Sequence, residues 1–282
     1  MYDTSAMLHD WIGKTETHHD VVTLWPMAAL SATLDRDDAP PQAGDPLPPL
    51  WHWLYFLPTD RQSALGPDGH ARRGGFLPPV ELPRRMWAGG RLTFHRAIHA
   101  GDAIARTSTI ASIQEKQGRS GALVFVVVRH EIAGPAGLAI TEEHDIVYRG
   151  HAPAAAAPPA APRDARWERA VQPGDVLLFR YSALTFNGHR IHYDRRYAVE
   201  TEGYPGLVVH GPLIATLLLD LLRRHQPDAD VASFEFRAVS PLFDTAPFRV
   251  CGKAGEAGGF ELWAANAAGG LAMTATVATR ER

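Results

Sequence analysis

The chain has 282 residues, of which 45% are hydrophobic and 21% charged, with a formal charge of −3 and a single cysteine. This composition is typical of a globular protein and excludes a fibrous or disordered chain, while the slight negative charge argues against a dedicated nucleic-acid binder. One cysteine excludes an internal disulfide, so we expect a protein of a reducing compartment, the cytoplasm. At roughly 150 residues per domain, the length predicts two domains.

Neither a leader nor a membrane span is expected. Residues 1–4 lack the basic and apolar segments of a signal peptide. The most apolar run, 213–222, is too short to cross a bilayer and contains Asp220. We therefore expect no membrane partner.

The first half, residues 1–150, is expected to form a helix followed by an antiparallel meander. Residues 28–34 have helical character. Four strand-like runs with many β-branched residues follow, at 90–98, 103–115, 122–132 and 138–148. Between the helix and the first strand lies an insertion, 40–90, which is rich in proline and aromatic residues and has no counterpart later in the chain.

An Ala/Pro tract separates the two halves. Residues 151–162 are almost purely alanine and proline and contain no aromatic side chain that could anchor a core. We interpret 151–166 as a linker, although a surface loop within one domain can have the same composition.

The second half, residues 167–282, is expected to repeat the plan. Residues 175–179 are predicted as a strand and 213–224 as a helix. Four further strands are predicted, at 232–239, 246–252, 260–265 and 272–278. The helix is apolar on nearly all sides, so it must be buried, as it would be inside a curved antiparallel sheet. The sequence thus predicts an α+β fold in which two antiparallel sheets each wrap a central helix.

The densest polar cluster contains Asn187, His189 and His192. The ordinary pKa of histidine suits proton transfer near neutral pH. The amide of Asn187, five residues before His192, could hold a water molecule within reach of that imidazole. The alternative is a polar loop with incidental histidines, since the chain has 14 of them.

Asp194 follows this cluster and has a structural interpretation of its own, as the cap of a helix that begins at Arg195. With His189 and His192 it also offers three metal ligands. The pattern lacks the glutamate of the His-Glu-x-x-His zinc motif, and no cysteine lies nearby. We therefore expect no metal, and a metal-dependent hydrolase stays as an alternative.

Gly211 stands at the start of the buried helix, between His210 and Pro212. Its backbone N–H would have the positive end of the helix dipole behind it, and could stabilise negative charge on a carbonyl oxygen. An ordinary helix start has the same pattern. Neither a P-loop nor a dinucleotide-binding glycine pattern is present, so no cofactor is expected.

The segment Tyr181–Asp194, followed by His210-Gly211-Pro212, resembles the hydratase motif of the MaoC-like, hot-dog-fold enoyl-thioester hydratases. Residues 83–91 resemble the double-hot-dog branch of that family, which includes type 2 hydroxyacyl-thioester dehydratases and hydratases of mesaconyl-C4-CoA and itaconyl-CoA. In the family at large the motif opens with an aspartate and has the catalytic histidine five residues later. These positions are Asn187 and His192 here, and the branch tolerates the asparagine. The resemblance implies a double hot dog that reversibly hydrates a short branched enoyl-CoA.

The resemblance also implies roles for individual residues. His192 is then the acid/base group, Asn187 positions water or substrate, and the Gly211 N–H receives the charge on the thioester oxygen. The first half has no matching Asn-x4-His, so it is expected to shape the acyl-CoA tunnel without catalysing. The candidates to bind the CoA phosphates are basic: Arg84, Arg85, Arg91, Lys116 and Arg119. Arg190 is the candidate for a free carboxylate on the acyl group, and His210 for a further substrate contact.

Two other functions stay open. One is a broader 3-hydroxyacyl-thioester dehydratase of fatty-acid metabolism, and the other is a non-catalytic hot dog that binds acyl-CoA. The expected partners are the acyl-CoA substrate and a second copy of the chain, because hot dogs commonly associate through sheet edges.

Overall fold

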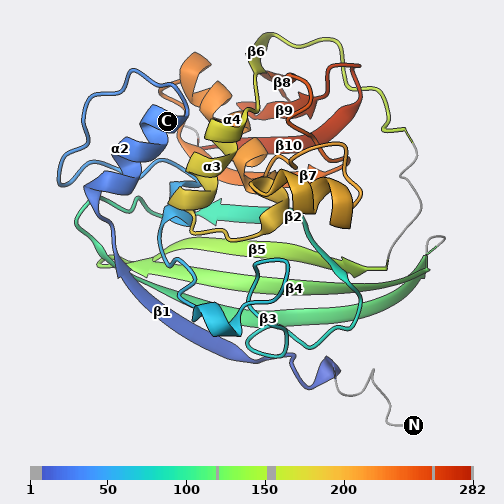
Figure 1. Ribbon diagram of the computed structural model, residues 1–282. Helices are drawn as coiled ribbons and strands as arrows, with labels where there is room; N and C mark the ends of the chain where they lie inside the picture. The colour runs from blue at the N-terminus through green and yellow to red at the C-terminus, as the bar shows by residue number, and fades with distance from the viewer. Residues whose placement is uncertain (1–7, 119–120, 151–156, 256–257, 281–282) are drawn as a thin grey trace.

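A ten-stranded antiparallel sheet curves around the helices of the protein (Figure 1). The computed structural model describes residues 8–118, 121–150, 157–255 and 258–280. The strand order is β1-β3-β4-β5-β2-β7-β10-β9-β8-β6. The first five strands in this order come from the first half of the chain and the last five from the second half.

The first half forms its helix and meander as predicted, with one additional strand. Its elements are β1 (Thr15–Val21), α2 (Leu24–Thr33), β2 (Arg84–Phe94), β3 (Ala103–Gly118), β4 (Gly121–Gly134) and β5 (Gly137–Arg149). β1 was not predicted because its sequence, TETHHDV, is polar except for Val21, and it lies mostly exposed at the sheet edge. The hydrophobic periodicity that reveals a half-buried strand is therefore missing from it.

The second half repeats this order. Its elements are β6 (Trp167–Val171), α3 (Asp175–Leu184), α4 (Gly211–His225), β7 (Val231–Ala238), β8 (Phe248–Ala254), β9 (Phe260–Ala265) and β10 (Leu271–Thr279). The prediction of a strand at 175–179 was wrong. Gly174 and Asp175 start a helix there, which buries Leu178 and Tyr181 and exposes Val176 and Phe179. Five residues are too few to distinguish that spacing from strand alternation.

The two predicted sheets are joined into one. Residues Gly89–Thr93 of β2 pair antiparallel with Ser233–Arg237 of β7, so the two meanders meet edge to edge. The second meander curves around α4, which contacts β6, β8, β9 and β10, as expected, whereas α2 of the first half packs against α3. In α4, all ten residues from Leu213 to Leu222 are buried, and each large aliphatic side chain there stabilises the fold by about 1.5–3 kcal/mol relative to exposure.

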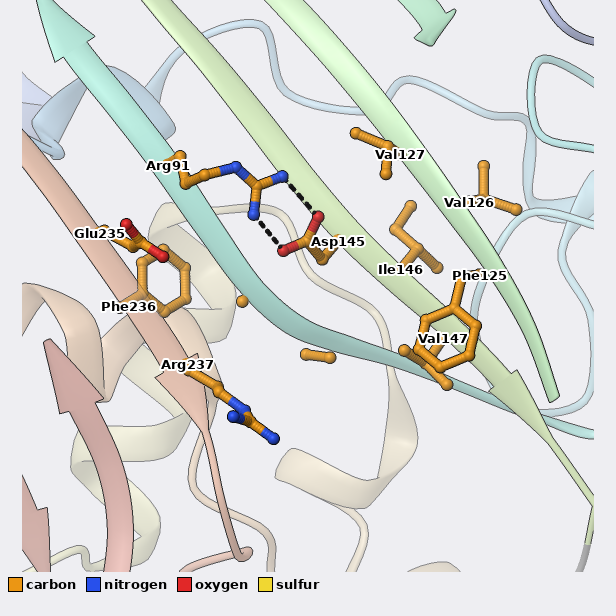
Figure 2. A pocket seen from close by; sticks show the side chains of 12 residues that line it. Arg91, Phe125, Val126, Val127, Asp145, Ile146, Val147, Glu235, Phe236 and Arg237 are labelled. Carbon is orange, nitrogen blue, oxygen red and sulfur yellow. Dashed lines mark hydrogen bonds and ion pairs between the residues drawn. The ribbon is translucent and has the colours of Figure 1, made fainter. Parts of the chain in front are cut away.

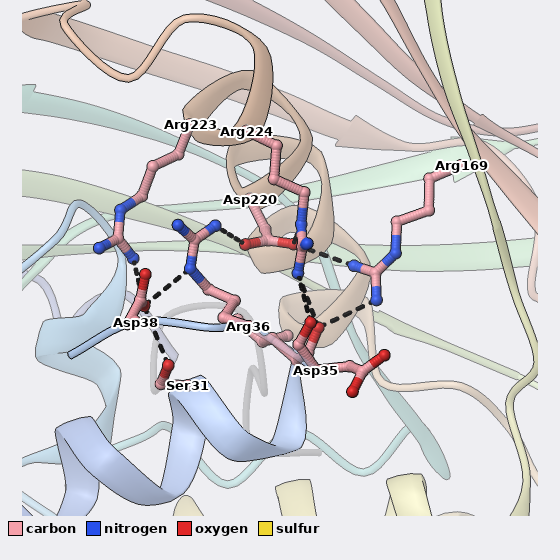
Figure 3. Close-up of polar contacts among 9 residues, drawn as sticks. Ser31, Asp35, Arg36, Asp38, Arg169, Asp220, Arg223 and Arg224 are labelled. Carbon is pink, nitrogen blue, oxygen red and sulfur yellow. Dashed lines mark hydrogen bonds and ion pairs between the residues drawn. The ribbon is translucent and has the colours of Figure 1, made fainter. Parts of the chain in front are cut away.

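Asp220 is the charged residue within the buried stretch of this helix, and it ties the two halves together (Figure 3). Its carboxylate accepts hydrogen bonds from Arg36 after α2 (2.6 Å), from Arg169 of β6 (3.0 Å) and from Arg224 of α4 (2.7 Å). Only 2% of its side chain is exposed, so these partners supply the hydrogen bonds that a buried charge requires.

The segment interpreted as a linker contacts the second half where the structure describes it. Residues 151–156 lie outside the described residues. Further along, the Ala161 N–H donates to Gly269 O (2.9 Å), and Ala161 is buried with Cys251 and Trp263. Cys251 is thus a packing residue. Among the described residues, no helix is both long enough and apolar enough to cross a membrane.

Candidate active site

His192 lies in a short 3₁₀ turn, Arg190–His192, beside the start of α4. Its ring is buried, with 8% of the residue exposed. Nδ1 lies 2.7 Å from the carbonyl oxygen of Val208. A carbonyl can only accept, so Nδ1 must carry the proton, and the neutral ring then presents a lone pair on Nε2. Within the described part of the chain Nε2 has no hydrogen-bond partner, so it is available to a ligand.

The His210 ring packs against one face of the His192 ring. The two imidazoles are stacked, with centroids 3.7 Å apart and an interplanar angle of 18°. His210 is fully buried and shares a 2.8 Å hydrogen bond between Nε2 and the Ser182 hydroxyl. The sequence nominated His210 for substrate binding; the structure places it fully buried against the His192 ring, with its Nδ1 unpartnered among the described residues.

Burial keeps these imidazoles neutral. Desolvation lowers the pKa of His192 to about 4, and the pKa of His189 to about 2, with the neighbouring His70 adding to the second effect. The pKa of His210 is lowered well below its ordinary value for the same reason. At neutral pH His192 is therefore a base rather than an acid.

Asn187 shapes the loop that leads to His192. Its Oδ1 accepts the backbone N–H of His189 (3.0 Å), so its NH2 group is the part left for a ligand. The residue before it, Phe186, has a φ of +46°, a left-handed conformation that is uncommon for a bulky residue. Such strain is concentrated at functional sites.

Gly211 begins α4 directly after His210. The first N–H groups of a helix have no partner within it, and the space where a Cβ would stand on Gly211 is open. A thioester oxygen can therefore approach the positive end of a 15-residue helix next to His192.

The insertion contributes a part of the site that the sequence did not reveal. The turn Asp68-Gly69-His70 packs against the His189 loop, and the His70 and His189 rings lie 4.1 Å apart. The Arg190 N–H donates to Asp68 O (2.9 Å). Gly69 has a φ of +90°, and a Cβ on it would lie 1.9 Å from Gly188 O, so only glycine fits at this contact. Because about 120 residues of sequence separate the two segments, spacing could not have predicted it.

Three of the basic side chains that the sequence suggested for substrate binding make contacts within the protein instead. Arg84 pairs with Glu202 and donates to its carbonyl oxygen (2.8 Å). Arg190 pairs with Asp194 at 2.7 Å and donates to Pro67 O. Lys116 lies over the ring of Phe125, where its side chain is exposed.

Arg91 lies on the outer face of the sheet (Figure 2). Because successive side chains of a strand point to opposite faces, Arg91 points away from the face on which Leu92 is buried. Its guanidinium forms a bidentate ion pair with the Asp145 carboxylate (2.7 and 2.8 Å). The hollow beside it, about 270 Å³, is lined by Phe125 and Arg237 among others, and it lies across the sheet from the core side chains. Arg85 faces the site and is treated below. Arg119 lies outside the described residues.

The three ligands of the alternative metal site, His189, His192 and Asp194, are not assembled. Asp194 accepts the Tyr197 N–H (3.0 Å) as the predicted helix cap, and its other oxygen binds Arg190. A different set with metal-ligating side chains, Asp68, His70 and His189, has its ligand atoms within 4.8 Å of one another.

Comparison with known proteins agrees with this geometry. The family model for hydroxyacyl-thioester dehydratase type 2 matches residues 50–244. The mesaconyl-C(4)-CoA hydratase of Chloroflexus aurantiacus is 49% identical over 280 residues, covering 97% of this chain and 98% of that protein. The mitochondrial hydroxyacyl-thioester dehydratase type 2 of Schizosaccharomyces pombe is 30% identical, covering 73% and 77%.

Solved structures show the same fold. The HtdX protein of Mycobacterium tuberculosis superposes with a TM-score of 0.67 at 21% identity, covering 95% of this chain and all of that one. Another M. tuberculosis protein, described as a double hot dog, superposes with a TM-score of 0.59 at 14% identity, covering 94% and 96%. The predicted double hot dog is therefore confirmed.

Proposed function

Because the chain belongs to the hydroxyacyl-thioester dehydratase type 2 family, we propose that it is a hydro-lyase that reversibly adds water to mesaconyl-C4-CoA. The 49% identity to a mesaconyl-C(4)-CoA hydratase, over nearly the whole of both chains, supports this substrate. Itaconyl-CoA, another short branched dicarboxylic thioester, is the next candidate.

The observation that carries the proposal is the state of His192. Its Nδ1–H is held by Val208 O and its pKa is lowered to about 4 by burial, so Nε2 is a base at neutral pH. One ring nitrogen is thus anchored, and the other is left open beside the start of α4. General-base catalysis requires this arrangement.

In the proposed reaction, Nε2 of His192 takes a proton from water as the water oxygen bonds to the β-carbon of the enoyl thioester. The π electrons move toward the thioester carbonyl, whose oxygen takes the negative charge and is stabilised by the Gly211 N–H. The His192 imidazolium then returns a proton to the α-carbon as the carbonyl re-forms. The Asn187 NH2 group orients the water. In the reverse direction the same groups dehydrate a 3-hydroxyacyl thioester.

The test is a panel of CoA thioesters followed by loss of enoyl absorbance. We expect mesaconyl-C4-CoA to be hydrated with the highest kcat/KM. Conversion of crotonyl-CoA without conversion of mesaconyl-C4-CoA would instead support a broader dehydratase, the activity that the fission-yeast relative's name describes. Binding without turnover of any member would show a non-catalytic acyl-CoA-binding protein.

We also propose that the protein is a cytoplasmic homodimer that needs no cofactor. β1 and β6, the two outer strands of the sheet, leave one edge each for a second copy. Light scattering of the purified protein should give about twice the chain's mass, and a value near the single mass would reject the dimer.

A further inference from the structure

A cluster with excess positive charge, formed by Arg85 and Arg73, lies near His70 and His189. Arg85 on β2 and Tyr148 on β5 are direct cross-strand partners, so their side chains share one face of the sheet. Tyr148 packs there against Val80 of the insertion. It is fully buried, and its hydroxyl makes no well-formed hydrogen bond among the described residues, although the Arg85 guanidinium lies within reach of it. A buried hydroxyl without a well-formed hydrogen bond is costly, and a bound anion would accept one from it.

Arg85 is the nominated arginine whose charge stays unpaired. Arg84, Arg91 and Arg190 each form an ion pair with a carboxylate. Arg85 is half-buried and has no carboxylate partner in the described part of the chain. A partly desolvated guanidinium is strongly attracted to an anion, because less water competes for it.

This cluster lies near the catalytic histidine. The charge of Arg85 adds to burial in lowering the pKa of both His70 and His189, so the guanidinium lies near both rings. His189 in turn meets His192 edge to face, with 5.4 Å between centroids. Only the acyl part of a thioester that reacts at His192 can reach this place, because the CoA phosphates lie at the far end of the pantetheine arm.

The charge of the surrounding groups favours an anion over a metal ion. Asp68, His70 and His189 could ligate a cation, but the Asp68 carboxylate is already bonded to His70 Nδ1 (3.0 Å). Arg85 and Arg73 both act on His70 through their positive charge. With the imidazoles neutral, two positive charges face one negative charge, which repels a divalent cation.

We propose that Arg85, with the Tyr148 hydroxyl beside it, binds the free carboxylate of the substrate's acyl group. This assignment rests on the proposed dicarboxylic substrate, and it replaces Arg190, which is occupied by Asp194. The carboxylate of mesaconyl-C4-CoA is attached to the β-carbon, the atom that water attacks. Holding that carboxylate therefore fixes the reacting carbon against His192.

The test compares Arg85→Met on two substrates that differ in the carboxylate. For mesaconyl-C4-CoA we expect kcat/KM to fall about a hundredfold, since one partner of a desolvated charge pair is removed. For crotonyl-CoA we expect a change of less than about threefold. Tyr148→Phe should show the same selectivity with a smaller loss. Arg129→Met, which removes an exposed arginine of β4, is the matched control and should change neither substrate.

A binding measurement separates this proposal from the proposed function. Succinyl-CoA and butyryl-CoA are saturated and cannot be hydrated, and only the first carries a carboxylate. Calorimetry should show that the wild type prefers succinyl-CoA and that Arg85→Met loses this preference, whether or not mesaconyl-C4-CoA is turned over. Equal losses on both thioesters, or a preference that survives in Arg85→Met, would overturn the carboxylate site. Stoichiometric zinc retained after dialysis by the wild type but lost in Asp68→Asn would overturn it in favour of a metal site.

Discussion

The two halves of the molecule each bury a group of histidines, but the polar group that holds the rings differs: the Glu142 carboxylate in the first half and a backbone carbonyl in the second. In the first half, the carboxylate of Glu142 accepts His52 Nε2 (2.9 Å), Trp53 Nε1 (2.8 Å) and His144 Nε2. Burial alone would raise the pKa of Glu142, but the charges of His144 and His52 hold it well below its ordinary value. Among the described residues of the second half no carboxylate is hydrogen-bonded to His192, and a carbonyl orients it instead.

This difference separates a structural network from a catalytic one. A buried carboxylate uses the surrounding imidazoles as donors and fixes them in place, which stabilises the fold. A carbonyl holds a single imidazole nitrogen and leaves the second nitrogen basic. The two halves share a fold, and the polar group placed among the histidines decides which of them can carry chemistry.

The largest expected effect is on His192. His192→Ala should lower kcat by about 10²–10⁴, the usual contribution of a general base, and leave the melting temperature close to that of the wild type. The assay is the loss of enoyl absorbance on the best thioester of the panel. Unchanged turnover would remove His192 from the mechanism.

The second largest effect is expected at the contact between Gly69 of the first half and Gly188 of the second half. Gly69→Ala would force a Cβ against Gly188 O, displacing the His189 loop, and should lower kcat/KM about a hundredfold because small misplacements at a reacting centre are expensive. Gly74→Ala is the matched control. Gly74 has the same positive φ of +89°, but the nearest atom to its Cβ would be 3.7 Å away. Equal kinetics for the two variants would contradict a role for the contact.

Glu142→Gln should show the opposite pattern to His192→Ala. Removing one partner of a buried charge pair is expected to lower the free energy of unfolding by about 3 kcal/mol, while kcat stays within about twofold. Urea unfolding and steady-state kinetics measure the two quantities. Glu131→Gln, on the exposed side of β4, should change neither. A large fall in kcat for Glu142→Gln would mean that the first half takes part in catalysis.

The smallest effect is on acid stability. The pKa of His192 is about 4 in the folded protein and near 6.5 in the unfolded chain. Between these two pH values the unfolded chain binds more protons than the folded protein. The stability that the neutral His192 ring contributes is therefore complete above about pH 6.5 and is lost as the pH falls toward 4. Wild type should therefore lose stability more steeply than His192→Ala between pH 7 and 5, by at most about 1.4 kcal/mol per pH unit. Parallel curves would show that His192 is not buried as a neutral ring.

Much of the fold could be predicted because its elements have clear patterns. The run of β-branched residues in β4 indicates a strand, and the apolar residues of α4 indicate a buried helix. β1 could not be predicted because its sequence is almost entirely polar and mostly exposed, and β6 was missed because five residues are too few to show a clear alternation. The pairing of β2 with β7 also left no local signal, because it joins segments that are far apart in sequence.

The candidate site could be predicted only for residues that lie close together in the sequence. Asn187 and His192 share one loop, and Gly211 follows closely, so spacing and resemblance were sufficient to nominate them. The turn at Asp68 and His70 was missed because the insertion containing it is dominated by proline and aromatic residues. Its Asp-Gly-His sequence, with a glycine that suits a left-handed turn between two polar residues, was the available signal.

The most direct test of the account is the pH dependence of kcat/KM for wild type with crotonyl-pantetheine, a thioester without phosphates or an acyl carboxylate that would titrate. If a buried, neutral His192 is the base, kcat/KM should be constant from about pH 8 down to about pH 5.5 and fall only as the pH approaches 4. A rate that falls through pH 6.5, the ordinary value for a solvated imidazole, would contradict it.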